Sequence, residues 1–222
     1  MSEAQSFHSE GVACRSHNST EGEDGERVTC SMESSNSSGT GEREEVKSDY
    51  RELLIGCGNS RKKKIDPAQK WVWHNLTTID HDPNCGADIV HDLEDYPWPF
   101  EDNTFDEVAA YCVLEHLGRQ GDYRSFFATF AEIYRILKPG GHLFALVPSI
   151  DDRWLWGDPS HTRVIQFESL VFLSQQQYQE QIGKTSMTDF RWLWKGDFET
   201  VGANDADGKF HFALKAHKPP RF

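Results

Sequence analysis

RELLIGCGNS, residues 51–60, is the stretch that decides the fold. Residues 51–55 (RELLI) pass directly into Gly-Cys-Gly at 56–58, which predicts a buried strand over 51–55 that ends in a tight turn. A strand without alternating polar residues is typical of a parallel sheet covered on both faces. Glycines at the end of such a strand let a ligand approach the backbone without a Cβ in the way. The stretch therefore predicts an α/β fold with a ligand site after its first strand.

Short apolar runs alternate with helical patterns through the rest of the domain, as expected for an α/β protein. Further strands are predicted at 76–80, 87–90, 105–111 and 142–147, and helices at 123–137 and 167–178. Segments 191–199 and 209–217 flank a turn signal at 205–208, which predicts a closing antiparallel pair. Between Gly58 and Leu76 there is room for only a short first helix, and after Asp80 the second crossover is expected to be a loop.

Residues 1–47 differ in composition from the rest of the chain. They hold ten acidic residues, four basic residues and one aromatic residue, Phe7. Such a segment cannot bury enough apolar surface to offset the entropy of ordering, so we predict a disordered acidic tail and a folded domain at 48–222. The tail is a candidate regulatory or tethering arm, and translation from Met32 is an alternative.

Composition excludes several classes of protein. The 222 residues carry 23 Lys and Arg against 36 Asp and Glu, a net charge of −13, which disfavours binding to a nucleic acid by bulk electrostatics. No apolar run approaches the roughly 18–20 residues of a bilayer span, and the first residues lack a signal-peptide pattern, so we expect a cytoplasmic protein. The five cysteines have unrelated spacings and no CxxC pair, so we expect reduced thiols and no metal site. Nothing in the sequence indicates an oligomeric state.

Asp80 lies about 22 residues after Gly58, at the end of the second predicted strand. An acidic side chain at this place can accept hydrogen bonds from ribose hydroxyls, which indicates a cofactor that contains adenosine. A nicotinamide dinucleotide is disfavoured because Arg61 stands where GxGxxG has its third glycine.

Five segments in order carry a more specific resemblance: LLIGCGNS, IDHDP, VHDLEDYPWPFEDNTFDEV, CVLEHL and ILKPGGHLFALVPS. From about residue 50 to 149 the chain resembles the class I S-adenosylmethionine-dependent methyltransferases of the small-molecule type. The resemblance implies a Rossmann-like fold with a mostly parallel seven-stranded sheet, a C-terminal antiparallel strand and trimmed early helices.

The resemblance also implies a set of cofactor-binding residues for S-adenosylmethionine. The glycine turn would pass under the methionine part, Asp80 would hold the ribose, the pair after the third strand would read the adenine edge, and the pair that ends the fourth strand would line the methionyl side. These residues are Gly56, Cys57, Gly58, Asp80, Asp92, Leu93, Tyr111 and Cys112. Plain core packing is an equal alternative for the aromatic stretch at 97–100. Leu54 stands where the family has an acid and Ser60 where it has a third glycine, so one partner of the cofactor's amino group is missing.

The acceptor site is predicted from polar residues after the fourth and fifth strands, at the sheet edge where open α/β folds bind ligands. His116, in the pair Glu115-His116, and His161 are candidate bases for a hydroxyl acceptor. In the loop at 149–163, Arg163 is a candidate clamp for an anionic acceptor and Trp156 a candidate contact, although a lid packed on the domain is the alternative. The basic run at 61–64 is expected to be solvated, or else to steer an anionic substrate.

The leading hypothesis is an S-adenosylmethionine-dependent methyltransferase that acts on a small molecule. The motifs of DNA amino-methylating enzymes and of cytosine carbon-5 methylating enzymes are absent, which further disfavours DNA as acceptor. The alternatives are a non-catalytic cofactor-binding or partner-activating protein and, third, a nicotinamide-dependent oxidoreductase.

Overall fold

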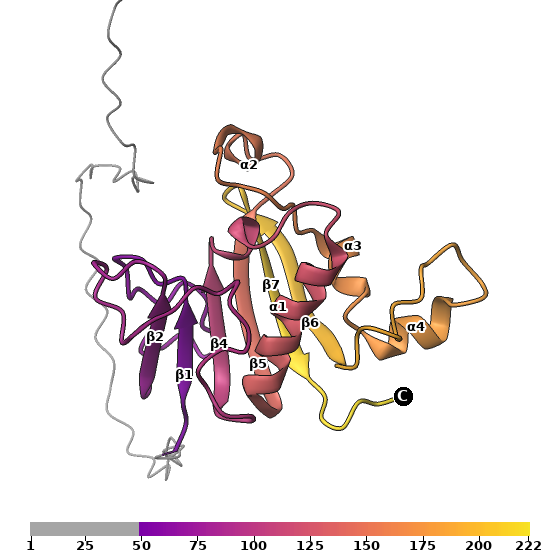
Figure 1. Ribbon diagram of the computed structural model, residues 1–222, viewed down its shortest axis with the longest axis horizontal. Coiled ribbons are helices and arrows are strands. Elements are labelled where there is room, and N and C mark those ends of the chain that lie inside the picture. Colours follow the sequence, from indigo (N-terminus) through magenta and orange to yellow (C-terminus); the bar gives the residue numbers. More distant parts are fainter. Residues whose placement is uncertain (1–48) are drawn as a thin grey trace, which may run out of the picture. The chain divides into compact units, whose positions relative to one another are not determined.

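The computed structural model describes residues 49–222, so the predicted tail at 1–47 lies outside the described residues. Its central element is one seven-stranded sheet with the strand order β3-β2-β1-β4-β5-β7-β6 (Figure 1). The strands are β1 (Glu52–Ile55), β2 (Leu76–Asp80), β3 (Ile89–Val90), β4 (Phe105–Tyr111), β5 (Leu137–Pro148), β6 (Phe198–Ala206) and β7 (Lys209–Ala216). The first five are parallel, and β7 lies antiparallel between β5 and β6. The predicted Rossmann-like sheet with a C-terminal antiparallel strand is confirmed.

The closing β-hairpin is shifted from its prediction. β7 lies where it was expected, but β6 begins at Phe198, so most of the predicted strand at 191–199 is not a strand. The turn between them is Asp207-Gly208, with φ of 52° and 71°. Positive φ at both central residues is the geometry of a two-residue hairpin turn, for which Asp-Gly is a preferred pair.

The helices are η1 (Leu114–His116), α1 (Tyr123–Ile136), α2 (Trp154–Gly157), α3 (Phe167–Val171) and α4 (Gln175–Gln181). The prediction of a single helix at 167–178 is wrong, because the helix is interrupted between α3 and α4. There the carbonyl of Leu173 accepts bonds from the Trp194 indole and the Phe198 backbone, and the side chain of Ser174 caps α4. None of the helices described between residues 49 and 222 combines the length and apolar character that a bilayer span requires.

The early crossovers are reduced further than predicted. The described structure has no helix between β1 and β2, where a short one was expected, and a loop between β2 and β3, as expected. Side-chain bonds hold these loops instead: the guanidinium of Arg61 donates to the carbonyls of Gly58 at 2.7 Å, Cys85 at 3.2 Å and Gly86 at 2.7 Å. Arg61 thus joins the turn after β1 to the loop after β2.

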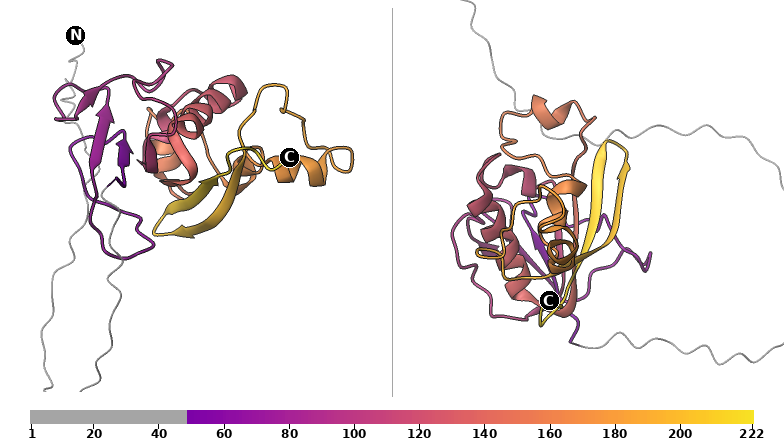
Figure 2. Two further views of the ribbon diagram at one scale, coloured as in Figure 1. Left: turned by 90° about the horizontal axis from the view of Figure 1, so that it is seen from below. Right: turned by 90° about the vertical axis from the view of Figure 1, so that its right-hand side faces the viewer.

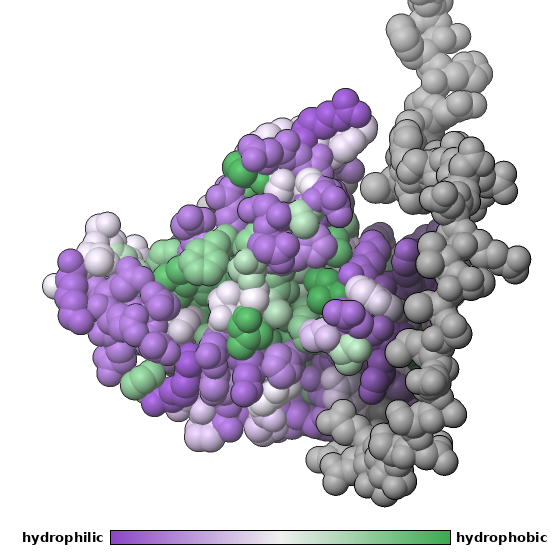
Figure 3. Space-filling model, turned by 180° about the vertical axis from the view of Figure 1, so that it is seen from behind, coloured by the Kyte–Doolittle hydropathy of each residue, from purple (hydrophilic) through white to green (hydrophobic). Residues whose placement is uncertain are grey.

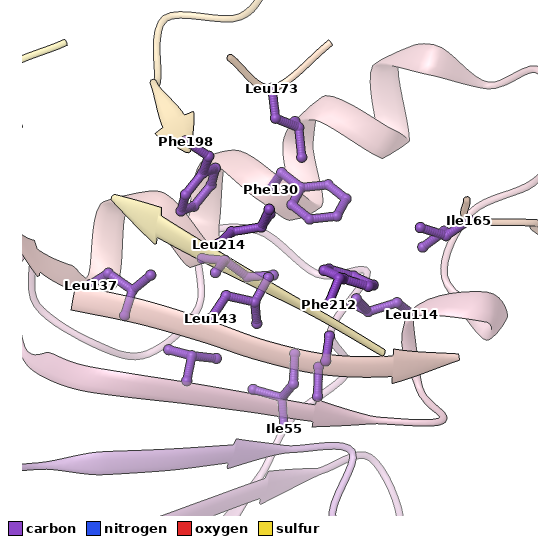
Figure 4. Packing of buried hydrophobic residues seen from close by; sticks show 14 of the residues in the cluster. Ile55, Leu114, Phe130, Leu137, Leu143, Ile165, Leu173, Phe198, Phe212 and Leu214 are labelled. Carbon is purple, nitrogen blue, oxygen red and sulfur yellow. The ribbon is translucent and has the colours of Figure 1, made fainter. Parts of the chain in front are cut away.

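The main core lies between the sheet and the helices on one face, where α1 packs against β5 (Figures 1 and 2). Figure 4 shows Ile55 and Leu143 from the strands directed toward this core, together with Phe130 of α1. Each large apolar side chain buried here contributes roughly 1.5–3 kcal/mol of transfer free energy. Leu170 of α3 and Tyr178 of α4 belong to the same core, so these helices cover the same face.

The opposite face of the sheet has no helical cover in the described part of the chain. Residues 56–75 cross it near β1, where Ile65 and Trp73 pack on a second small core. Figure 3, which views this side, shows apolar residues gathered in its middle. On this face Phe144, Val201 and Ala213 line a groove of about 430 Å³.

Lys63, from the basic run at 61–64, is buried beneath this face rather than solvated. Its ammonium contacts the carboxylate of Glu52 on β1 and lies 3.1 Å from that of Glu107 on β4. The parallel register pairs these two carboxylates side by side, so one cation serves two acids. Burial raises the pKa of Glu107 to about 7, and Glu52 adds to this effect against the opposing charge of Lys63. The predicted solvation of the basic run is therefore wrong at Lys63.

We expect Glu107→Gln to change the pH dependence of stability. The pKa of Glu107 in the folded state lies above its ordinary value of 4.5. The folded chain therefore binds the proton of Glu107 more tightly than the unfolded chain does. The contribution of this group to the free energy of unfolding is present at low pH and is lost as pH rises toward 7. The variant keeps the Lys63–Glu52 pair and lacks the titrating group, so it does not lose this contribution. Its free energy of unfolding should rise by about 1–3 kcal/mol relative to that of the unmodified protein between roughly pH 4.5 and 7.

Urea unfolding at a series of pH values measures this difference. Glu101→Gln is the matched control, because Glu101 is exposed. A free-energy difference that is constant across the pH range in both variants would contradict the assignment of a raised pKa to Glu107.

Candidate functional site

The glycine turn after β1 requires glycine at both of its ends. Gly56 and Gly58 have φ of 57° and 49°, in the left-handed region. A Cβ on Gly56 would lie 2.3 Å from the side chain of Val113, so glycine lets the end of β1 pack against the segment after β4. A Cβ on Gly58 would meet no heavy atom within 4 Å. The backbone of this turn is therefore open to a ligand at Gly58.

Asp80 joins the turn to the end of β2. The N–H of Gly58 donates to Oδ2 of Asp80 at 2.8 Å, and the N–H of Asp82 donates to Oδ1 at 2.9 Å. The carboxylate is nearly buried, and each of its oxygens still has a second lone pair. A carboxylate held in this way beside an open backbone turn fits the ribose hydroxyls of an adenosine cofactor, so the residues present fit the predicted group.

Cys57, Tyr111 and Cys112 occupy three different environments around the turn. Cys57 is buried beside Cys85, and burial raises the pKa of its thiol to about 11. Tyr111 points into the second core, where its hydroxyl oxygen accepts a bond from the N–H of Ile65 at 3.2 Å. Cys112 has a φ of 55°, and its N–H donates to the carbonyl of Leu146. Tyr111 therefore supports the segment after the turn, whereas Cys112 lies at the bend that follows β4.

Asp92 and Leu93, which follow β3, lie in different environments. Asp92 is exposed, and its Oδ1 accepts the N–H of Glu94 at 2.9 Å. The side chain of Leu93 is buried in the main core, and its carbonyl accepts the indole N–H of Trp98. Trp98 is 2% exposed, which supports the core-packing interpretation of the aromatic stretch at this residue. A contact of Leu93 with adenine would have to come from its backbone.

The structure brings His116 and His161 together at the carboxyl edge of the sheet. Their ring centroids lie 4.8 Å apart. The backbone explains this: the carbonyl of Glu115 accepts the N–H groups of both Thr162 and Arg163 at 3.0 Å, so the loop after α2 is tied to η1. Burial lowers the pKa of His116, and the neighbouring His161 lowers it further. Both imidazoles predicted as candidate bases thus share one site.

Glu115 completes this group, although no separate role was predicted for it from the sequence. Its side chain is 0% exposed, and neither carboxylate oxygen has a hydrogen-bond partner among the described residues. Burial raises its pKa to about 7. The Glu-His pair after β4 is visible in the sequence, but the approach of His161 follows only from the fold.

Arg163 does not face an acceptor as predicted. Its side chain is buried, Nε donates to the carbonyl of Leu117 at 3.0 Å, and Nη2 donates to the carbonyl of Asp122 at 3.0 Å. The guanidinium is used to hold the segment between η1 and α1. Trp156, on α2, is 72% exposed, so it is not packed on the domain as a closed lid would be.

Comparison with known proteins gives one family match. Residues 53–145 match the family model described as a methyltransferase domain. No curated protein sequence matches the chain.

Two solved structures are among those to which the chain is similar. A SAM-dependent methyltransferase from Archaeoglobus fulgidus is 14% identical, with 75% of this chain and 86% of that chain covered and a TM-score of 0.45. The N-methyltransferase NodS from Bradyrhizobium japonicum, in complex with S-adenosylhomocysteine, is 18% identical, with 76% and 78% covered and a TM-score of 0.45.

We expect Asp80→Ala to weaken the binding of S-adenosylhomocysteine about 10- to 100-fold, because ribose hydroxyls would lose a partner worth roughly 1–3 kcal/mol. Calorimetric titration measures the affinity. Asp82→Ala is the matched control, since this neighbouring acid caps only its own turn, at Asn84. Equal affinity in the two variants would remove Asp80 from the site, and a thermal melt of each variant checks that the fold is intact.

Proposed function

We propose that this protein, whose residues 53–145 match the methyltransferase-domain family model, is a class I S-adenosylmethionine-dependent methyltransferase that transfers a methyl group to a small-molecule acceptor. S-adenosylmethionine is the cofactor of this family. The observation that carries the proposal is the bond between Gly58 and Asp80, which holds an open glycine turn and a carboxylate together at the sheet edge. The histidines at the same edge, His116 and His161, supply groups that can act on the acceptor.

The cofactor supplies an electrophilic methyl on a sulfonium: as the acceptor's lone pair bonds to the methyl carbon, the carbon–sulfur bond breaks and its electrons stay on sulfur. The chain has to align the acceptor with that methyl at about 3–3.5 Å and exclude water. The backbone at Gly58 and the carboxylate of Asp80 would fix the cofactor. No nucleophilic side chain of the protein is needed for this reaction.

A hydroxyl acceptor also has to lose its proton, and a neutral histidine is suited to this near neutral pH. Nδ1 of His161 lies 3.3 Å from the carbonyl of Leu155, and because a carbonyl only accepts, Nδ1 carries the hydrogen. Nε2 is then the nitrogen with the lone pair in the neutral ring. Oδ2 of Asp158 lies 3.8 Å from that Nε2. His161 is our first candidate for the base.

A non-catalytic, partner-activating protein is the second candidate. Leu54 stands where the family has an acid. It is 2% exposed and packs in the second core, so it supplies no polar group to the cofactor's amino end. The groove on the sheet face without helices, lined by Phe144 and Val201, offers such a protein a surface for a partner.

We expect the full-length protein to transfer label from methyl-labelled S-adenosylmethionine to a component of a fractionated small-molecule extract. His161→Ala should lower this turnover about 100-fold or more, the usual range for loss of a general base, with little change in S-adenosylhomocysteine affinity. His142→Ala, which removes a half-buried histidine on β5, is the control.

Unchanged turnover in His161→Ala would contradict the role of this histidine. Tight binding of the cofactor with no labelled product in any fraction would contradict methyl transfer to a small molecule and favour the second candidate.

A further inference from the structure

We propose that Glu115, His116 and His161 form a binding site for one divalent transition-metal ion. The three side chains offer ligand atoms that all lie within 4.8 Å of one another. Two imidazoles and one carboxylate are a ligand set typical of Zn²⁺, Fe²⁺, Mn²⁺ and Co²⁺ sites that keep positions open for water or substrate. No metal site was predicted from the sequence, because His161 lies far from Glu115 and His116 along the chain.

The carboxylate of Glu115 is the first argument for an ion. It is fully buried, and neither oxygen has a hydrogen-bond partner among residues 49–222. An ionised carboxylate buried without a partner is strongly unfavourable, and a protonated one would still lack an acceptor for its hydrogen. A bound cation would satisfy both oxygens at once.

The orientation of the two histidines is the second argument. Nδ1 of His116 lies 3.1 Å from the carbonyl of Ser160, and Nδ1 of His161 lies 3.3 Å from that of Leu155. Both rings therefore carry hydrogen on Nδ1 and keep the lone pair on Nε2. Histidines that bind metals are commonly oriented in this way, by a backbone carbonyl on the other ring nitrogen.

The site is also built before any ligand arrives. The N–H groups of Thr162 and Arg163 donate to the carbonyl of Glu115, and the hydroxyl of Thr162 lies 3.3 Å from the carbonyl of His116. These bonds fix the loop that carries His161 against η1. Oδ2 of Asp158, 3.8 Å from Nε2 of His161, is close enough to become a further ligand after a small movement.

A second group, Cys57, Asp80 and Cys85, has ligand atoms equally close together. It is the weaker metal site for two reasons. Unlike those of Glu115, both oxygens of Asp80 already accept backbone N–H groups, from Gly58 and Asp82, so this carboxylate needs no cation to satisfy it. Burial also raises the pKa of Cys57, and it is the thiolate that binds metals.

An ion at Glu115, His116 and His161 would lie at the sheet edge where the acceptor is expected. A divalent ion lowers the pKa of a hydroxyl that coordinates it, so it would take over the task of the histidine base and favour an oxygen acceptor. This consequence rests on the proposed methyl transfer, whereas metal binding itself does not.

The test is titration of the full-length, tag-free, chelator-treated protein with Co²⁺, followed by calorimetry and visible absorption in the absence of cofactor. We expect one equivalent to bind at this site, with affinity reduced about 100-fold or more in Glu115→Gln and in His161→Ala, because losing a ligand should cost at least as much as losing an outer-shell partner. His217→Ala is the matched control: it removes another histidine paired with a carboxylate, Glu199 at 2.6 Å, and should leave this binding unchanged.

Three results would overturn the proposal: no Co²⁺ binding, equal binding in all variants, or an absorption band from a cobalt–thiolate bond, which would assign the ion to the cysteines. Because the Glu115 variant changes a buried group, His161→Ala, on a loop, decides the question if Glu115→Gln does not fold. S-adenosylhomocysteine titrations of the same proteins separate the two proposals. Retained cofactor binding and turnover without Co²⁺ binding would overturn the metal site alone.

Discussion

The hydrogen bond from Gly58 to Asp80 is the interaction on which the rest of the site depends. No helix follows β1 or β2 in the described structure, so the turn after β1 cannot be positioned by a helix that continues from it. The carboxylate of Asp80 and the guanidinium of Arg61 do this instead, by bonding to backbone groups of the two loops. The reduced fold therefore keeps its ligand edge through side-chain bonds rather than through crossover helices.

Packing contacts at the same edge of the sheet position the polar groups of the candidate site. Gly56 lets the end of β1 approach Val113, which directly precedes η1. In η1 the carbonyl of Glu115 accepts two backbone N–H groups from the loop that carries His161. The glycine turn and the histidine group are thus positioned by one continuous set of contacts. A buried, unpartnered carboxylate is unfavourable for stability alone, and its place at this edge is consistent with a role in binding.

The sequence predicted those features that local pattern determines, namely β2 and β4 to the residue, the glycine turn, and Asp80 at the end of β2. It missed those that arise only when distant segments meet. The break before α4 depends on bonds from Trp194 and Phe198, and the burial of Lys63 depends on the parallel pairing of two strands.

The site follows the same rule. His116 and His161 were each predicted from their position after a strand, but their contact and the part played by Glu115 needed the fold. Arg163 was predicted to bind the acceptor because a guanidinium suits anions, yet its N–H groups donate to the carbonyls of Leu117 and Asp122.

The measurement that decides whether this edge of the sheet binds the predicted cofactor is calorimetric titration of the full-length protein with S-adenosylmethionine, its demethylated product and NAD. We predict one site with affinity on the order of micromolar for the first two and no binding of NAD. Binding of NAD alone, or of none of the three, would contradict it.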